Sequence, residues 1–212
     1  MRKHINTLLM AVGIFMLGFS ISLLRYGDLG TDPYTTMNLG VSSSLPLSFG
    51  LYQLLINFVL FAIVWKKKRH TIGLGTIVNM VMVGFVSDFF YHIVVTFLPD
   101  FPSLSFRLIV TTVAVLIACI SISMYMESGL GIAPYDAITT IVVDASIGRI
   151  PFFAARVTVD VLAVLIGFFF GATVGIGTLM LAFLTGPVVQ LIREQVIRRV
   201  LFPVQSTIRE TI

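Results

Sequence analysis

Two segments of this chain, one in each half, carry nearly the same motif. Residues 27–36 read Gly-Asp-Leu-Gly-Thr-Asp-Pro-Tyr-Thr-Thr, and residues 128–137 read Ser-Gly-Leu-Gly-Ile-Ala-Pro-Tyr-Asp-Ala. Each copy follows a long apolar run, and the Gly-x-Gly-Thr segment at 73–76 recurs at 175–178. The two halves are therefore duplicated over most of their length. A duplication of this size in a membrane protein predicts a pseudo-symmetric bundle with its site between the repeats.

The composition places the chain in a lipid bilayer. Hydrophobic residues make up 57% of the 212 residues and charged residues only 11%, whereas a soluble domain carries about 25% charged residues. We therefore expect a single membrane domain over residues 1–212. Cys119 is the only cysteine, so an intramolecular disulfide is excluded.

Six apolar segments are long enough to cross a bilayer core of about 30 Å as helices. The expected fold class is thus an all-α polytopic membrane protein with six transmembrane helices. They cover approximately residues 5–25, 48–65, 72–97, 106–126, 151–170 and 174–195. The first segment has the length of a span and no cleavage site, so it is not expected to be a removed signal peptide.

The basic residues predict the orientation. With both termini in the cytoplasm, the inner side receives Arg2, Lys3, Lys66, Lys67, Lys68, Arg69, Arg149, Arg193, Arg198, Arg199 and Arg209. The outer side then receives only Arg25 and Arg107. This distribution follows the positive-inside bias.

Each repeat holds three spans, repeat 1 over about 5–97 and repeat 2 over about 106–195. Because three is odd, the second copy must enter the membrane upside down relative to the first. The expected arrangement is a 3+3 inverted-topology repeat, which is typical of many secondary transporters. The remaining residues, 196–212, begin with a basic amphipathic pattern that fits a helix on the inner leaflet.

A short helix is expected after the first span and another after the fourth. Proline is favoured at the first helical position, so Pro33 and Pro134 predict helix starts. Each helix is either a half-helix dipping into the membrane or an interfacial helix on its surface, and the sequence leaves both open. If the half-helices line a site, Thr35 and Asp136 in their first turns are candidate substrate-binding residues.

The fifth span carries a charged pair one helical turn apart, Arg156 and Asp160. Charges within a span are costly and tend to be paired inside the bundle. At the equivalent turn of the first repeat stand Gln53 and Asn57. Asn57, Arg156 and Asp160 are therefore candidate substrate-binding residues, with a purely structural ion pair as the simpler interpretation.

Asp88 and His92 form a similar pair in the third span. A carboxylate and an imidazole one turn apart could relay protons. An interfacial hydrogen bond is the simpler account of the same spacing.

Enzyme motifs are absent from the sequence, so we expect no catalytic residues, no cofactor and no metal site. The basic residues follow membrane topology, and nucleic-acid binding is not expected. The expected partners are the lipid bilayer and an unidentified small molecule, with a homodimer as an open alternative.

The motif at 129–135, its copy at 27–34 and the stretch Gly73-Leu74-Gly75-Thr76-Ile77-Val78-Asn79-Met80 resemble the YczE/YyaS/YitT-type family of bacterial integral membrane proteins, in its YczE-like branch. The resemblance extends over nearly the whole chain. It implies a multi-pass protein of the bacterial plasma membrane and leaves the activity open. Tyrosine stands at 34 and 135, where many relatives are expected to have tryptophan.

Two functions remain open at this stage. The first is a small-molecule secondary transporter or exporter with its site at the interface of the inverted repeats. The second is a non-transporting membrane subunit that binds a ligand or acts as a scaffolding or regulatory partner.

Overall fold

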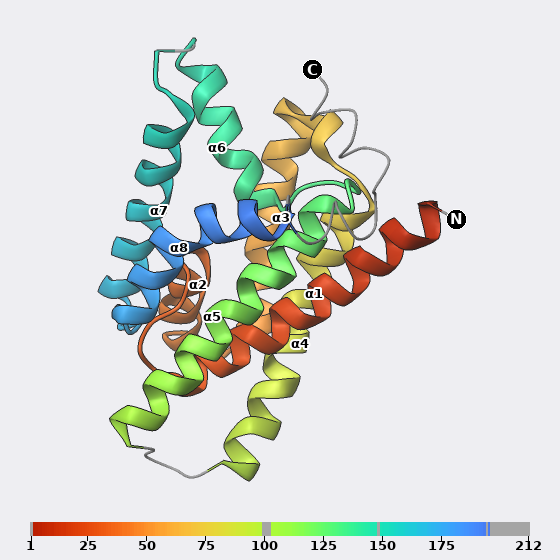
Figure 1. The fold of residues 1–212 in the computed structure, drawn as a ribbon. Helices are drawn as coiled ribbons and strands as arrows, with labels where there is room; N and C mark the ends of the chain where they lie inside the picture. Colours follow the sequence, from red (N-terminus) through yellow and green to blue (C-terminus); the bar gives the residue numbers. More distant parts are fainter. Residues whose placement is uncertain (1, 99–102, 148, 194, 196–212) are drawn as a thin grey trace.

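The computed structural model describes residues 2–98, 103–147, 149–193 and 195, and within them the regular structure is helical (Figure 1). One long helix, one short helix and two long helices follow one another twice along the chain. The first set is α1 (Arg2–Gly27), α2 (Pro33–Ser43), α3 (Phe49–Lys67) and α4 (Leu74–Phe97), with the short 3-10 helix η1 (Arg69–Thr71) before α4. The second set is α5 (Leu104–Glu127), α6 (Pro134–Ala145), α7 (Phe152–Phe169) and α8 (Ile176–Ile192).

Four helices in the described part of the chain are long and apolar enough to span a membrane. They comprise Lys3–Gly27, Phe49–Lys67, Leu74–Phe97 and Leu104–Glu127, so the prediction of a multi-pass all-helical membrane protein is confirmed at this level. The segments expected as the fifth and sixth spans form α7, of 18 residues, and α8, of 17 residues. At 1.5 Å per residue these helices are slightly shorter than a bilayer core of about 30 Å, and six spans remain a prediction.

The expected short helices are present. Asp32 is the N-cap of α2, its side chain accepting a hydrogen bond from Thr35 N, and Pro33 follows at the first helical position. In α6 the N-cap is Ala133 and Pro134 occupies the first position. Both prolines thus start helices, as predicted.

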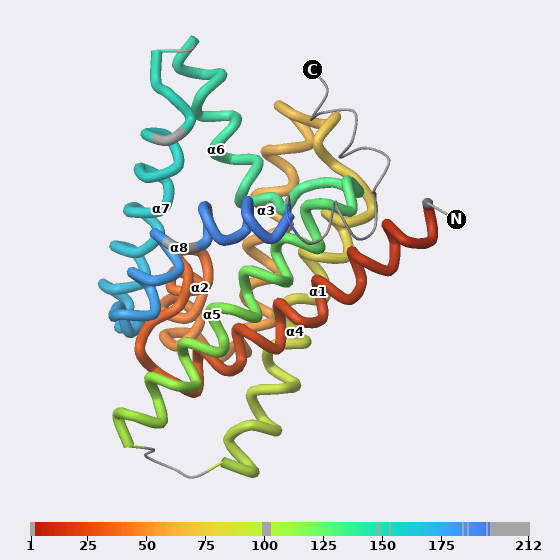
Figure 2. The backbone as a smooth tube through the Cα atoms, viewed as in Figure 1, coloured from red at the N-terminus to blue at the C-terminus, as the bar shows by residue number. Residues whose placement is uncertain are grey.

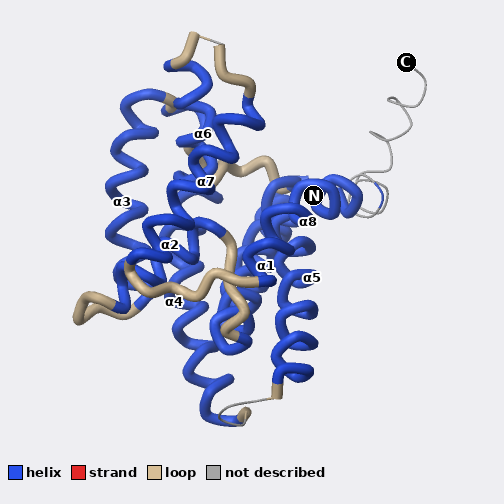
Figure 3. Tube along the Cα trace, turned by 90° about the vertical axis from the view of Figure 1, so that its left-hand side faces the viewer, coloured by secondary structure: helices blue, strands red, loops and turns tan. Residues whose placement is uncertain are grey.

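The helices pack in a crossed arrangement in which each short helix contacts a long helix of the other set. α1 packs along α5 and α4, α5 also packs along α8, α2 packs on α7, and α3 packs on α6. The end of α4 and the start of α5 lie at the bottom of Figure 1, whereas the end of α6 and the start of α7 lie at its top. Figure 2 traces the same path as a tube, and Figure 3 shows α2, α3, α6 and α7 beside the α1, α5 and α8 group.

Two buried clusters form the apolar core. One joins α1, α5 and α8 and includes Leu24, Val115 and Leu181, with Cys119 fully buried inside it. The other joins α1 to α3, α4 and α5, and its members are Met10, Ile14, Ile21, Phe49, Val83 and Tyr125. α1 is therefore the central helix of the packing.

Glycines let the loop before each short helix approach the start of a long helix. The N–H of Gly75 donates to the carbonyl of Leu130 at 2.7 Å, and the N–H of Gly177 donates to that of Leu29, also at 2.7 Å. Gly30 and Gly131, at matching places in the repeated motif, have φ angles of +98° and +116° that favour glycine. The duplicated glycine motifs thus contact each other across the two sets of helices.

The C-terminal tail expected over 196–212 and the turn at 99–102 lie outside the described residues.

Candidate functional site

The first turns of α2 and α6 meet through two tyrosines. Tyr34 is the second residue of α2 and Tyr135 the second residue of α6, and their rings stack with centroids 4.6 Å apart and planes inclined by 27°. The N-terminus of a helix has unpaired N–H groups and a positive partial charge. Two positive helix ends are therefore brought together, and acceptor groups are expected around them.

Each tyrosine hydroxyl donates to a side chain on the long helix that follows. The Tyr34 hydroxyl donates to Asn57 Oδ1 on α3 at 2.7 Å, and the Tyr135 hydroxyl donates to Asp160 Oδ1 on α7 at 2.7 Å. Asn57 is 1% exposed, and its amide nitrogen donates to the carbonyl of Met80. Asn57 and Asp160, two candidates from equivalent turns of the sequence, thus make equivalent contacts.

Arg156 connects the two other candidate residues on the second half of the chain, Asp136 and Asp160. Its Nε donates to Asp160 at 2.9 Å, which confirms the predicted pair within α7, and its Nη1 donates to Asp136 on α6 at 2.6 Å. The guanidinium carbon also lies 5.3 Å from the centre of the Tyr135 ring. These side chains are only partly buried, so the network lies at the edge of the packed centre.

Asp32 adds a third carboxylate; in the sequence it is only the residue before Pro33, which predicts the helix start. It lies close enough to interact electrostatically with Asp160 and Arg156. Burial raises the pKa of the Asp32 carboxyl above its ordinary value, and hydrogen bonds from Thr35 act in the opposite direction. The side chains described here carry three carboxylates, on Asp32, Asp136 and Asp160, against one guanidinium.

The acidic side chains do not converge on a common point. Among the residues that the structure describes, no group of three or more His, Cys, Asp or Glu side chains is placed to hold a metal ion. The excess of carboxylate is therefore spread over the first turns of α2 and α6 and over α7.

Two further buried polar residues next to the tyrosine stack were not predicted as site residues from the sequence. Asn38 and Thr139 lie one helical turn after Tyr34 and Tyr135, at matching positions, and both are completely buried. Asn38 Oδ1 and Thr139 Oγ1 have no hydrogen-bond partner within the described residues. The signal was available in the sequence, because a polar residue follows each tyrosine by four positions.

Thr35, another candidate, is buried in the first turn of α2 and 1% exposed. Its backbone N–H donates to Asp32 Oδ1 at 3.1 Å. It is thus part of the capping of α2, next to the tyrosine stack.

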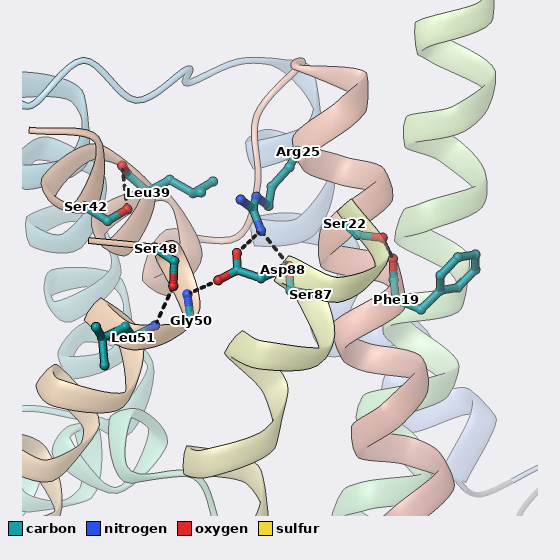
Figure 4. Close-up of polar contacts among 10 residues, drawn as sticks. All are labelled: Phe19, Ser22, Arg25, Leu39, Ser42, Ser48, Gly50, Leu51, Ser87 and Asp88. Carbon is teal, nitrogen blue, oxygen red and sulfur yellow. Dashed lines mark hydrogen bonds and ion pairs between the residues drawn. The ribbon is translucent and has the colours of Figure 1, made fainter. Parts of the chain in front are cut away.

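Asp88 is paired with Arg25 of α1 (Figure 4). Arg25 Nη1 donates to Asp88 Oδ1 at 2.8 Å, and the N–H of Gly50 at the start of α3 donates to Asp88 Oδ2 at 2.7 Å. Within the described residues, Asp88 and His92 do not form the hydrogen bond that their spacing suggested. Asp88 faces α1 and α3, whereas His92 is exposed. A proton-relay role for Asp88 and His92 remains a prediction.

A comparable ion pair in the second half, at nearby but not equivalent positions, has reversed charges. Arg25 lies near the end of α1, and Glu127 is the last residue of α5. Glu127 accepts a hydrogen bond from Arg193 Nε at the end of α8 at 3.1 Å. In each half, the first long helix is therefore joined to the fourth helix by an ion pair, with the acid and the base exchanged.

Two shallow, open hollows of the described surface lie away from the tyrosines. One is lined by Phe61, Ala62, Trp65 and Lys66 of α3, and the other by Lys3, His4, Thr7, Leu8 and Ala11 of α1. The contact between α2 and α6 is filled by the stacked tyrosine rings.

Comparison with known proteins confirms the predicted resemblance. The chain is 25% identical to the uncharacterized membrane protein YczE of Bacillus subtilis over 88% of this chain and 84% of the relative. It is 28% identical to the uncharacterized protein YyaS of the same organism over 82% of this chain and 86% of the relative. An uncharacterized protein of Haemophilus influenzae is 27% identical over 89% of this chain and 82% of the relative. No solved structure matches the chain significantly.

The family model described as "Family of unknown function (DUF6198)" matches residues 4–194, which is most of the chain. The relatives show that the chain is homologous to a bacterial membrane protein, and the spanning helices agree with that location. The chain belongs to the DUF6198 family of unknown function.

Proposed function

We propose that this protein is a small-molecule secondary transporter or exporter of the bacterial plasma membrane. The observation that carries the proposal is the stacking of Tyr34 on Tyr135, which joins the first turns of two short helices beside the Arg156 network. Short helices whose N-termini meet inside a bundle are typical of the discontinuous helices that form transporter sites. The proposed site is therefore the contact between α2 and α6.

The proposal includes six spans arranged as a 3+3 inverted repeat, with α7 and α8 as the fifth and sixth. Paired contacts support a two-fold relation between the halves: Gly75 N to Leu130 O matches Gly177 N to Leu29 O. The tyrosine hydrogen bonds match in the same way. An axis in the membrane plane would then pass near the tyrosine stack, and both chain termini would be cytoplasmic.

The two halves of the proposed site have different chemistry. Gln53 and Asn57 on α3 are neutral, whereas the equivalent Arg156 and Asp160 on α7 are charged and bonded to each other. A substrate with a charged group would therefore interact chiefly with α6 and α7. In this proposal α3 serves as the neutral wall of the site, and Asp32 at the start of α2 adds a carboxylate.

One observation favours the second candidate, a non-transporting membrane subunit. The tyrosine rings fill the contact between α2 and α6, and two shallow, open hollows lie on the surfaces of α1 and α3. A protein that only binds a ligand or a partner at its surface needs no central path.

A thermal-shift screen of the purified protein against metabolites and pH tests the proposal, since a ligand that binds the native state raises its melting temperature. A site ligand should stabilise the wild type and Thr158→Ala but not Arg156→Gln. Thr158→Ala is a suitable control because Thr158 lies on α7 with Arg156, yet its side chain is exposed and its hydroxyl donates to the carbonyl of Ala154 outside the proposed site.

Uptake of the same ligand into proteoliposomes then separates the two candidates. Saturable uptake that Arg156→Gln abolishes would support a transporter. Binding without uptake in either direction would support the non-transporting subunit.

A further inference from the structure

The cytoplasmic end of α3 in the proposed topology carries a shallow, open hollow with an apolar lining and a basic border. Its lining residues are Phe61, Ala62, Trp65 and Lys66. Phe61 and Trp65 lie one helical turn apart, with ring centroids 5.7 Å from each other, and Trp65 is 53% exposed. Two aromatic rings therefore form an open apolar wall at the end of a membrane-spanning helix.

Arg69 extends this wall with a positive charge. It follows Trp65 by four residues, and its guanidinium carbon lies 5.5 Å from the centre of the Trp65 ring. A cation over an aromatic face is held there by the ring quadrupole. Arg69 is exposed, so the guanidinium is available to a ligand that approaches along the tryptophan.

The other basic residues at this end of α3 are Lys66, Lys67 and Lys68, of which one is bonded within the protein and two face outward. Lys68 bonds Asp144 of α6 at 2.5 Å and is mostly buried. Lys66 and Lys67 are exposed, and in the described part of the chain no ion pair involves them. At the end of a helix long enough to span the bilayer, these two lysines and Arg69 are expected at the level of the lipid headgroups.

We infer that the end of α3 binds an anionic phospholipid. The phosphate would be bonded by Lys66 and Arg69, and the upper part of one acyl chain would lie against Phe61 and Trp65. Basic residues beside a spanning helix attract anionic lipids of the cytoplasmic leaflet, and tryptophan prefers the boundary between headgroups and acyl chains. The inference does not depend on transport.

The second hollow provides a matched comparison. It is also basic, through Lys3 and His4, but its lining of Lys3, His4, Thr7, Leu8 and Ala11 contains no benzene or indole ring to pack against an acyl chain. If charge alone attracted lipid, the two hollows would behave alike. The aromatic wall is what distinguishes the α3 hollow.

Trp65 is the only tryptophan of the chain, so its fluorescence reports directly on this position. The protein is reconstituted in vesicles that contain brominated phosphatidylglycerol or brominated phosphatidylcholine at the same molar fraction. We expect stronger quenching of Trp65 by the brominated anionic lipid. Equal quenching by the two lipids would overturn the inference.

The double variant Lys66→Gln, Arg69→Gln should lose the preference of the α3 hollow for phosphatidylglycerol over phosphatidylcholine. Each charge is worth about 1 kcal/mol, so each substitution should lower the relative affinity for the anionic lipid about fivefold. The double variant Lys3→Gln, His4→Gln is the control and should keep the preference for the anionic lipid. If the preference survives in the first double variant, Lys66 and Arg69 do not bind the lipid. Circular dichroism and melting temperatures verify that both variants fold.

A competition experiment distinguishes binding of the whole lipid from binding of its free headgroup. Soluble glycerol phosphate at millimolar concentration should not relieve the quenching, because the acyl chain contributes to binding. Full relief by glycerol phosphate would show a site for soluble phosphate esters and would contradict the assignment to a lipid.

Discussion

The ring of Tyr34 stacks on the ring of Tyr135 at 4.6 Å, and each hydroxyl donates a 2.7 Å hydrogen bond to the long helix that follows it in the chain. Through these contacts α2 is connected to α3, and α6 is connected to α7. A movement of one short helix must therefore displace the other or break the stack. This coupling between the halves is the structural basis of the proposed function.

The stack should contribute a measurable interaction energy. In a double-mutant cycle of Tyr34→Leu and Tyr135→Leu, we expect a coupling of about 0.5–1.5 kcal/mol, the range of aromatic pairs. Unfolding free energies in mixed micelles provide the measurement. Tyr34→Leu with Phe90→Leu, whose ring packs on Phe15 and Phe19, is the control pair and should be additive. Additive effects of the two tyrosine variants would contradict the stack.

Arg156 should be the least replaceable member of its network. Arg156→Leu leaves Asp136 and Asp160 without their shared cation, whereas Asp160→Asn leaves Arg156 bonded to Asp136. Since hydrogen bonds to charged groups contribute about 1.5–3 kcal/mol, we expect Arg156→Leu to lower the unfolding free energy by about 2 kcal/mol and Asp160→Asn by less.

The combined variant Arg156→Leu, Asp136→Asn, Asp160→Asn should recover part of that loss, because no unpaired charge remains. The alternative is additivity: the triple variant would then be less stable than Arg156→Leu by the separate losses of Asp136→Asn and Asp160→Asn. That result would show that the three residues are not coupled.

Asp88 should contribute to stability and His92 should not. Asp88→Leu removes the acceptor of both Arg25 and the Gly50 N–H, so it should be more destabilising than Asp88→Asn, which keeps an oxygen for Gly50. His92→Leu replaces an exposed side chain and should change the unfolding free energy by less than about 0.5 kcal/mol. A loss with His92→Leu equal to that of Asp88→Leu would indicate that the two residues act as a pair.

Gly73 and Gly75 offer a matched pair of substitutions. A Cβ at Gly73 would overlap the carbonyl of Leu130, whereas a Cβ at Gly75 would meet the nearest atoms at 3.1–3.3 Å. Gly73→Ala should therefore lower the melting temperature much more than Gly75→Ala, because the Cβ at Gly73 overlaps backbone atoms outright, whereas the neighbours of Gly75 need to shift by only a few tenths of an ångström. Equal melting temperatures would show that the loop before α6 does not pack on the start of α4.

The sequence was sufficient for features that depend on neighbours along the chain. Pro33 and Pro134 predicted the starts of α2 and α6, because a proline restricts its own residue and the one before it. Arg156 and Asp160 are one turn apart on one helix, so their contact needed no knowledge of the fold.

Features that depend on which helices meet were not predictable in the same way. The partner of Asp88 is Arg25 on another helix, whereas spacing along α4 suggested His92. Periodicity shows which residues share a face but not which helix covers that face. The contact of Tyr34 with Tyr135 likewise requires α2 and α6 to meet, although the repeated motif already marked both residues.

Two-sided cysteine accessibility tests the central claim most directly. In a Cys119→Ala background, Thr35→Cys and Asp136→Cys are labelled with an impermeant thiol reagent from each side of oriented vesicles, with Ser44→Cys and Lys67→Cys marking the outer and inner sides. Thr35 is buried and the Asp136 side chain is half-exposed. We therefore predict that position 136 reacts readily from inside, that position 35 reacts more slowly and from outside, and that a screened ligand changes the two rates in opposite directions. Reaction of both positions from one side only, at rates that no ligand changes, would contradict the account.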